Sequence, residues 1–245
     1  GIAGSYTDSG SLALSGAGSG SGNFITSTTT ATIDPSVFDI SGNMTVSATD
    51  SAAITATAGA AAVSISVSDD GTNVGVGLGI SVAVNDITSS ALAIIDDTTV
   101  NAGGAALVTA ASTADIQALA FGVALSITTS SDTSISVDGG VAVTLNTIDT
   151  TTRAAIEDSD TDTVNTLNAG GAVTLNATDS GMIEADAVSV AASIAISSGS
   201  GSSISGSIAV SYAENSIEST TEATIDSVDT TAQGNVALTA SSSKV

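Results

Sequence analysis

Residues 74–87 read VGVGLGISVAVNDI, and this stretch decides the class of fold. From position 74 to 84 large aliphatic residues occupy every second position, and Gly, Ser or Ala occupies each position between them. A period of two is typical of a β-strand, so all six large side chains lie on one face and only tiny ones on the other. The run at 188–196 has a comparable pattern. We expect the large side chains, such as Ile80 and Ile194, to face the protein interior.

The composition is that of a folded but unusually acidic chain. The 245 residues include 25 acidic and only two basic ones, Arg153 and Lys244, which gives a formal charge of -23, and there is no Cys, His or Trp. Strong acidity with few aromatics can indicate disorder. Here 42% of the residues are hydrophobic and many of them alternate with small polar residues, which favours a folded protein.

The charge and the hydrophobic pattern also exclude classes of partner. Two basic residues cannot neutralise a phosphate backbone, so we predict no nucleic-acid binding. Anionic membrane surfaces would repel the chain, and no run of 18 apolar residues is present, so we predict no membrane insertion.

The sequence repeats. The tripeptide Asn-x-Ile recurs at spacings of 62, 61 and 69 residues, and eight residues after each Ile comes another Ile followed by an acidic residue. A second block places Gly, a Val or Leu, and Ala at fixed spacings. Residues 1–245 are therefore interpreted as a single repeat array, with a divergent partial unit 1–22, units 23–84, 85–145 and 146–214, and a partial unit 215–245. The acidic ladder consists of Asp34, Asp96, Glu157 and Asp226.

The repeat predicts an all-β fold, a repetitive parallel β-solenoid (β-helix), with stacked β-hairpin sandwich repeats as the alternative. A solenoid coil of about 20 residues would give three coils per unit and an advance of roughly 14 Å. At that spacing the ladder carboxylates would lie beyond the Debye length of about 8–10 Å. The alternation changes parity at Ala120–Phe121 and at Ala187–Val188, where we expect a bulge or a corner.

Few residues are suited to chemistry. Without His and Cys, the usual general base and thiol nucleophile are missing, so we predict that the chain is not an enzyme. Asp158, Asp160 and Asp162 alternate within the one expanded linker, as ligands of calcium often do. The EF-hand pattern fails, because Thr163 stands where Gly is needed. The alternatives are a calcium site at these three residues and a solvated acidic loop; no other cofactor is predicted.

Several strings resemble a known family. They are VAVNDI (82–87), VTLNTIDTTTRAAIED (143–158), AGGAVTLNATD (169–179) and ENSIESTTEATID (214–226). They are similar to the repeat arrays of giant bacterial surface proteins, the filamentous haemagglutinin- or leukotoxin-like adhesins. The resemblance covers nearly the whole chain apart from the first 22 residues. It implies a β-helical shaft on an extracellular protein, with adhesion often located elsewhere on the molecule.

The sequence therefore predicts a secreted bacterial protein at the cell surface or outside the cell, in which this segment is a non-catalytic shaft or spacer. Its expected partners are neighbouring copies of the same repeat, a homo-polymer, or a host or cell-surface ligand. Two alternatives stay open. One is a subunit of an extracellular filament or sheath that polymerises through strand edges. The other is a calcium-dependent binding module.

Overall fold

The computed structural model describes residues 1–160 and 165–245, and within them it contains β-strands and no helix. The expectation of an all-β fold is confirmed. No helix in these residues is therefore long and apolar enough to cross a membrane. The strands are β1 (Ile2–Ile33), β2 (Ser36–Ile40), β3 (Met44–Asp96), β4 (Thr98–Ala102), β5 (Ala106–Ser130), β6 (Ser134–Glu157), β7 (Thr166–Ala169), β8 (Val173–Ser197), β9 (Ser203–Asp226), β10 (Asp229–Ala232) and β11 (Val236–Lys244).

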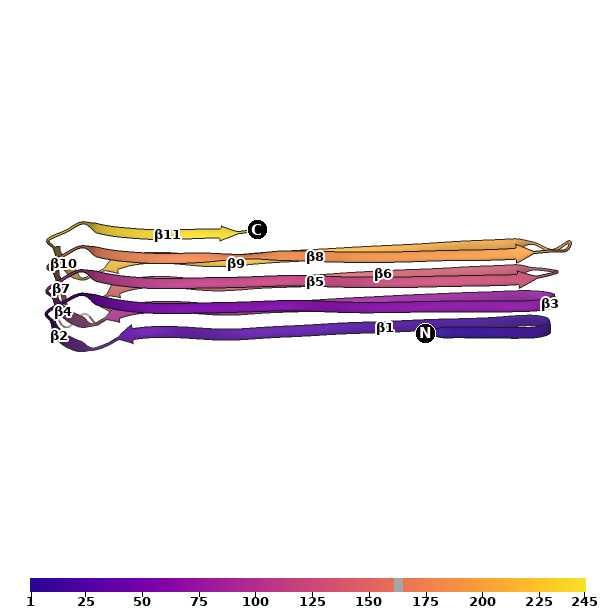
Figure 1. Cartoon of the computed structure of the whole chain (residues 1–245), viewed down its shortest axis with the longest axis horizontal. Helices are drawn as coiled ribbons and strands as arrows, with labels where there is room; N and C mark the ends of the chain where they lie inside the picture. Colours follow the sequence, from indigo (N-terminus) through magenta and orange to yellow (C-terminus); the bar gives the residue numbers. More distant parts are fainter. Residues whose placement is uncertain (161–164) are drawn as a thin grey trace.

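The chain runs in repeated circuits, each built from two long arms and one short strand (Figure 1). In one circuit an outgoing arm, β5, leads to a tight turn, and a return arm, β6, runs back to the short strand β7. We call the end with the short strands the base and the end with the tight turns the tip. The outgoing layer comprises residues 44–67 of β3 with β5, β8 and β11, and the return layer comprises residues 11–33 of β1 and 73–96 of β3 with β6 and β9.

All strand pairings in the described residues are parallel, and they join residues one repeat apart. Val46 lies beside Val108 and Val108 beside Leu175, in the register that the sequence spacing predicts. Residues 11–22 also pair in register, with 73–84. The two arms of a circuit do not pair with each other as a hairpin in this part of the chain. The architecture is compatible with a parallel β-solenoid.

The expected three coils per unit are wrong: one unit makes one circuit. The strand continues without interruption from Asn85 through Ile95, where short coils would need turns. An arm such as β6 has 24 residues and spans about 80 Å at roughly 3.3 Å per residue. One unit therefore advances the stack by about 4.8 Å, the distance between paired strands, and not by 14 Å.

The large buried side chains gather at the base, between three walls. Val46 comes from the outgoing layer, Ile95 from the return layer and Val100 from the short strands, and together with their equivalents they form the largest apolar cluster. Ile95 and Val100 are 1% and 0% exposed. Burying such aliphatic side chains is the main stabilisation available to this fold.

Toward the tip the residues between the layers become smaller. Ile54 and Ile87 share one cluster, and Ala58 and Ala83 share the next. Further out a Cβ atom added at Gly122 would lie 2.3 Å from the carbonyl oxygen of Val141. The two backbones therefore lie so close that only glycine fits between them.

The large residues of the tip half consequently face outward, contrary to expectation. Ile80 is 38% exposed and Ile194 is 46% exposed, whereas their small neighbours such as Ser81 are buried. Hydrophobicity alone would place the aliphatic side chains inside. The narrow space between the layers is filled mostly by glycine, alanine and serine, with Thr128 and Asp138 also buried there, and the large aliphatic side chains take the outer face.

The expected bulges at the parity changes are also wrong. β5 and β8 stay paired without a shift through Ala120–Phe121 and Ala187–Val188. Inward positions keep their parity along the arm, and the large residues move to the outer face. Among residues 1–160 and 165–245 the paired strands show one register shift, between Ser9 and Ser11, where Gly10 has a positive φ of 64°.

Candidate functional site

Two of the three predicted calcium residues, Asp158 and Asp160, lie at the base, in the segment that follows β6. Asp158 accepts a hydrogen bond from the backbone N–H of Asn165 at 3.2 Å, and the backbone N–H of Asp160 donates to Asp97 at 2.8 Å. Asp162 lies outside the described residues. The structure thus places Asp158 and Asp160 in one loop, beside acidic residues of the preceding circuit that the sequence prediction missed.

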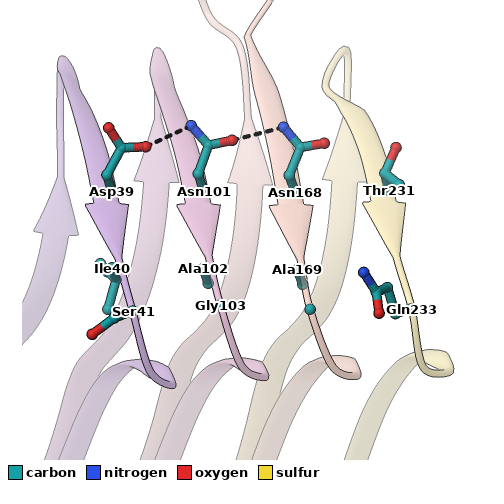
Figure 2. A pocket seen from close by; sticks show the side chains of 11 residues that line it. Asp39, Ile40, Ser41, Asn101, Ala102, Gly103, Asn168, Ala169, Thr231 and Gln233 are labelled. Atoms are coloured by element: carbon teal, nitrogen blue, oxygen red, sulfur yellow. Dashed lines mark hydrogen bonds between the residues drawn. The ribbon is translucent and has the colours of Figure 1, made fainter.

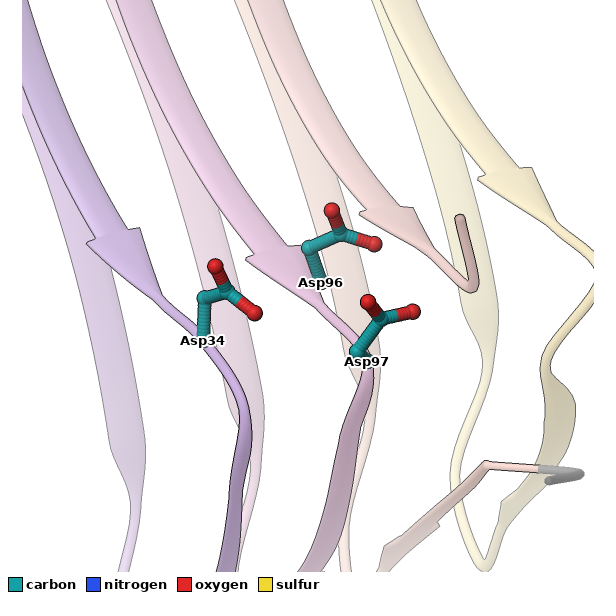
Figure 3. Close-up of side chains that lie close together, drawn as sticks. All are labelled: Asp34, Asp96 and Asp97. Carbon is teal, nitrogen blue, oxygen red and sulfur yellow. The ribbon is translucent and has the colours of Figure 1, made fainter. Parts of the chain in front are cut away.

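Three carboxylates of neighbouring circuits form a cluster at the start of the short strands. One carboxylate oxygen from each of Asp34, Asp96 and Asp97 lies within 4.8 Å of the other two (Figure 3). The expectation that neighbouring ladder carboxylates lie roughly 14 Å apart is therefore wrong, because adjacent circuits are single strand spacings apart. The three carboxylates lie closer together than one Debye length, so salt does not fully screen their mutual repulsion, which destabilises the fold.

Hydrogen bonds already engage part of this cluster. Ser159 donates its backbone N–H to Asp96 at 3.0 Å and its hydroxyl to the other oxygen of Asp96 at 2.8 Å. The N–H of Asp160 is the main cause of a lowered pKa at Asp97, because it stabilises the ionised carboxylate. The cluster has ligand types that suit a hard cation, but Asp96 and Asp97 already accept hydrogen bonds from Ser159 and Asp160, and calcium binding stays a prediction.

A groove of about 630 Å³ runs along the outside of the short strands (Figure 2). A ladder of side chains lines it: Asn168 donates to Asn101 and Asn101 donates to Asp39, both at 2.8 Å. No aromatic side chain is among its described lining residues. The groove can offer hydrogen bonds to a polar ligand.

A polar column runs between the layers nearer the middle of the arms. Asp50, Ser112, Asp179 and Ser242 stack one per circuit. Each faces a hydroxyl across the gap: Ser27 to Asp50 and Thr150 to Asp179 both measure 2.8 Å. The column joins the two layers through hydrogen bonds.

Lys244 completes this column in the last circuit. Its ammonium lies 3.0 Å from Asp179 and donates to Thr150 at 2.8 Å, and its side chain is only 5% exposed. The ion pair links β11 to β8 within the outgoing layer, and the hydrogen bond to Thr150 of β6 links β11 to the return layer. The sequence analysis did not predict this ion pair or the polar column. One signal was present: Asp50 occupies the same alternate positions as Ala48 and Ala52, so it faces inward with them.

A further buried carboxylate, Asp138, lies in the tip half. It is 2% exposed, and burial is the main cause of its raised pKa, partly offset by the backbone N–H groups of Ser126 and Gly77. Its equivalents in other circuits are Ser15, Gly77 and Ser207. These interior carboxylates are closed off by both sheets, so a substrate could not reach them without separating the layers.

Comparisons with protein families, with curated proteins and with solved structures found no match to this chain. The similarity to bacterial adhesin arrays therefore stays a prediction.

Proposed function

We propose that the chain is a segment of a parallel β-solenoid that serves as a non-catalytic structural shaft or spacer in an extracellular bacterial adhesin or surface protein. The proposal combines the circuit architecture with the acidic, cysteine-free composition and the family resemblance of the repeats.

One observation supports it above the others. The Asn of each Asn-x-Ile motif stacks on the next, with side-chain hydrogen bonds of 2.8 Å from Asn23 to Asn85, 2.8 Å from Asn85 to Asn146 and 2.9 Å from Asn146 to Asn215. Each amide donates to one neighbour and accepts from the other, so identical units can be added without a change of contacts. Such a nearest-neighbour array is suited to building length and surface.

The geometry specifies the shape of such a shaft. Each circuit adds about 4.8 Å of height but is about 80 Å wide, as the arm length requires. The segment is therefore a plate, with broad faces and short height, and many circuits would be needed for a tall shaft.

The test is to insert a second copy of residues 85–145 after residue 145 in the full chain. We expect small-angle scattering to show one dimension longer by about 4.8 Å and the thermal midpoint to rise, because one more interface between circuits forms. An inserted unit that stays unfolded, or a particle that lengthens along the arms, would refute the proposal.

Assembly through strand edges is the second candidate, and a specific observation favours it. β9 pairs on one side only, with β6, among the described residues. Its free backbone groups can template a further strand. Electron microscopy of the purified chain should then show fibres that Thr220→Pro in β9 abolishes, since proline removes a backbone donor; short particles without fibres would reject edge assembly.

A further inference from the structure

The outer surface of the return layer is apolar over its tip half. We call this surface the return face and define it by the outward side chains of 12–22 in β1, 74–84 in β3, 135–145 in β6 and 204–212 in β9. It includes Leu14, 61% exposed, and Ile208, 69% exposed. These are the residues that the narrow interior displaced to the outside.

Within these ranges the return face has no charge despite the net charge of -23, and Glu214, the next outward residue of β9 beside Leu145, borders it. Its outward positions hold Val, Leu, Ile, Gly and one Tyr. The one acidic residue within its ranges, Asp138, points inward and is 2% exposed. A surface without charge on so acidic a protein is one on which two copies can meet without repulsion.

The size of the return face fits a dimer interface. Ten residue steps along β1, β3 and β6 and eight along β9, across about 19 Å of strand spacing, give an area of roughly 600 Å². Two such faces would bury about 1,200 Å² in total, the lower bound for specific protein interfaces. Exposed apolar patches of this extent on a monomer commonly mark interaction sites.

The relief of the face is complementary to itself. At one level along the strands the four neighbours are Gly16, Leu78, Gly139 and Ile208. At the adjacent level they are Leu14, Val76, Val137 and Gly206. A two-fold axis parallel to the strands reverses the strand order of a second copy. It therefore places Ile208 over Gly16 and Leu14 over Gly206.

The surface beside the two end glycines of these rows, Gly16 and Gly206, is open space. A Cβ atom added at Gly16 or Gly206 would have no atom within 4 Å. Their missing side chains are therefore not required by packing inside the chain, in contrast to Gly122. A bulky residue of a second copy can occupy the space instead.

We propose that a second copy of this chain docks on the return face, forming a two-fold dimer in which Ile208 and Leu14 of each copy fill the hollows at Gly16 and Gly206 of the other. Such an interface uses the same patch twice, as closed two-fold dimers do. It differs from strand addition at an edge, and it does not depend on the proposed shaft function.

The test fills one hollow. Gly16→Val adds an apolar, strand-favouring side chain whose Cβ has no atom of its own chain within 4 Å. Non-specific hydrophobic association would become stronger, whereas docking of Ile208 would be blocked. The matched control is Gly4→Val, because Gly4 lies on β1 beside Ile65 of the outgoing layer and also has no atom within 4 Å.

Sedimentation velocity over a wide concentration range measures the monomer–dimer equilibrium of each chain. We expect a reversible dimer for the unchanged chain and for Gly4→Val, and a dimer at least about tenfold weaker for Gly16→Val and for Gly206→Val. Circular dichroism and the thermal midpoint should show all four chains equally folded.

Several results would overturn the proposal. A chain that is monomeric at every concentration would do so, as would Gly16→Val chains that dimerise as well as or better than Gly4→Val. So would a monomer that binds neutral phosphatidylcholine vesicles, since the return face would then be a lipid-binding surface. Fibres that persist in both glycine variants would report edge assembly and show that the return face does not drive association.

Discussion

At the residue scale, two ladders of amides make the same hydrogen bonds in different surroundings. Asn146 is 2% exposed, accepts from Asn85 at 2.8 Å and donates to Asn215 at 2.9 Å. We expect Asn146→Ala to lower the free energy of unfolding by about 2–4 kcal/mol, because both neighbours lose a partner in a buried position. Urea unfolding measures the change.

The matched control is Asn101→Ala in the groove at the base. Asn101 also makes two bonds, to Asp39 and from Asn168, both at 2.8 Å, but this ladder faces solvent. Water can replace the lost bonds there, so we expect a loss of about 1 kcal/mol or less. Equal losses in the two variants would show that the Asn-x-Ile ladder contributes nothing through its burial.

Asp138 makes the stability of the tip half dependent on pH. Its pKa is raised by burial, so the folded state binds more protons than the unfolded state between the ordinary and the raised pKa. Stability therefore falls as pH rises through that window and stays low above it. Asp138→Ser, which copies the equivalent Ser207, should raise the midpoint at neutral pH and reduce this dependence; a lower midpoint at neutral pH would contradict the assignment.

Removal of divalent ions tests the carboxylates at the base. The N–H groups of Ser159 and Asp160 already donate to Asp96 and Asp97. We therefore expect the same thermal midpoint with calcium and with a chelator. A midpoint that rises with calcium, and no longer does so in Asp97→Asn, would establish a cation site at this cluster.

At the scale of the element, glycine has two different roles in the same arms. A Cβ at Gly122 would lie 2.3 Å from the backbone oxygen of Val141, whereas Gly20, in β1, has open space around it. We expect Gly122→Ala to cost about 1–3 kcal/mol through overpacking. Gly20→Ala should be neutral or stabilise by about 0.4–1 kcal/mol, since alanine limits the unfolded chain. Equal effects on the urea midpoint would mean that the layers can separate to admit a methyl group.

The two-residue alternation of the arms could be predicted from sequence, but which of the two strand faces points to the interior could not. Alternation at Val74–Val84 identifies a strand whichever way it faces. The inward side depends on the distance between two layers, which no single strand specifies. Gly79 and Gly122 are the residues that reveal the short distance between the layers. A Cβ added at either one would lie 2.4 Å or less from a backbone oxygen of the other layer.

The length of the arms was predictable in part. Residues 23–33 contain neither glycine nor proline, a sign that one strand continues through the Asn-x-Ile motif. The coil number could not follow from the eight-residue spacing of Ile25 and Ile33, since a turn or an extended strand would both satisfy it. The cluster of Asp34, Asp96 and Asp97 could not be found for the same reason, as it depends on one circuit per unit.

At the scale of the whole molecule, one circuit per repeat stacks like charges at short range. Asp149 lies directly beside Glu218 on the outer surface, at about the 4.8 Å strand spacing. With 25 acidic and two basic residues, opposite charges are too few to relieve such columns. Like charges facing each other across paired strands cost about 0.2–1 kcal/mol per pair.

Salt should therefore stabilise this protein. Raising NaCl from about 0.01 M to 1 M shortens the Debye length from roughly 30 Å to 3 Å, below the spacing of the stacked carboxylates. We expect the thermal midpoint to rise with salt, and the double variant Asp149→Asn with Glu218→Gln to have a higher midpoint at low salt and a smaller salt response. Three coils per unit would place these two residues about 14 Å apart, where their neutralisation would change the salt response far less, so the size of that change measures the stacking of the circuits.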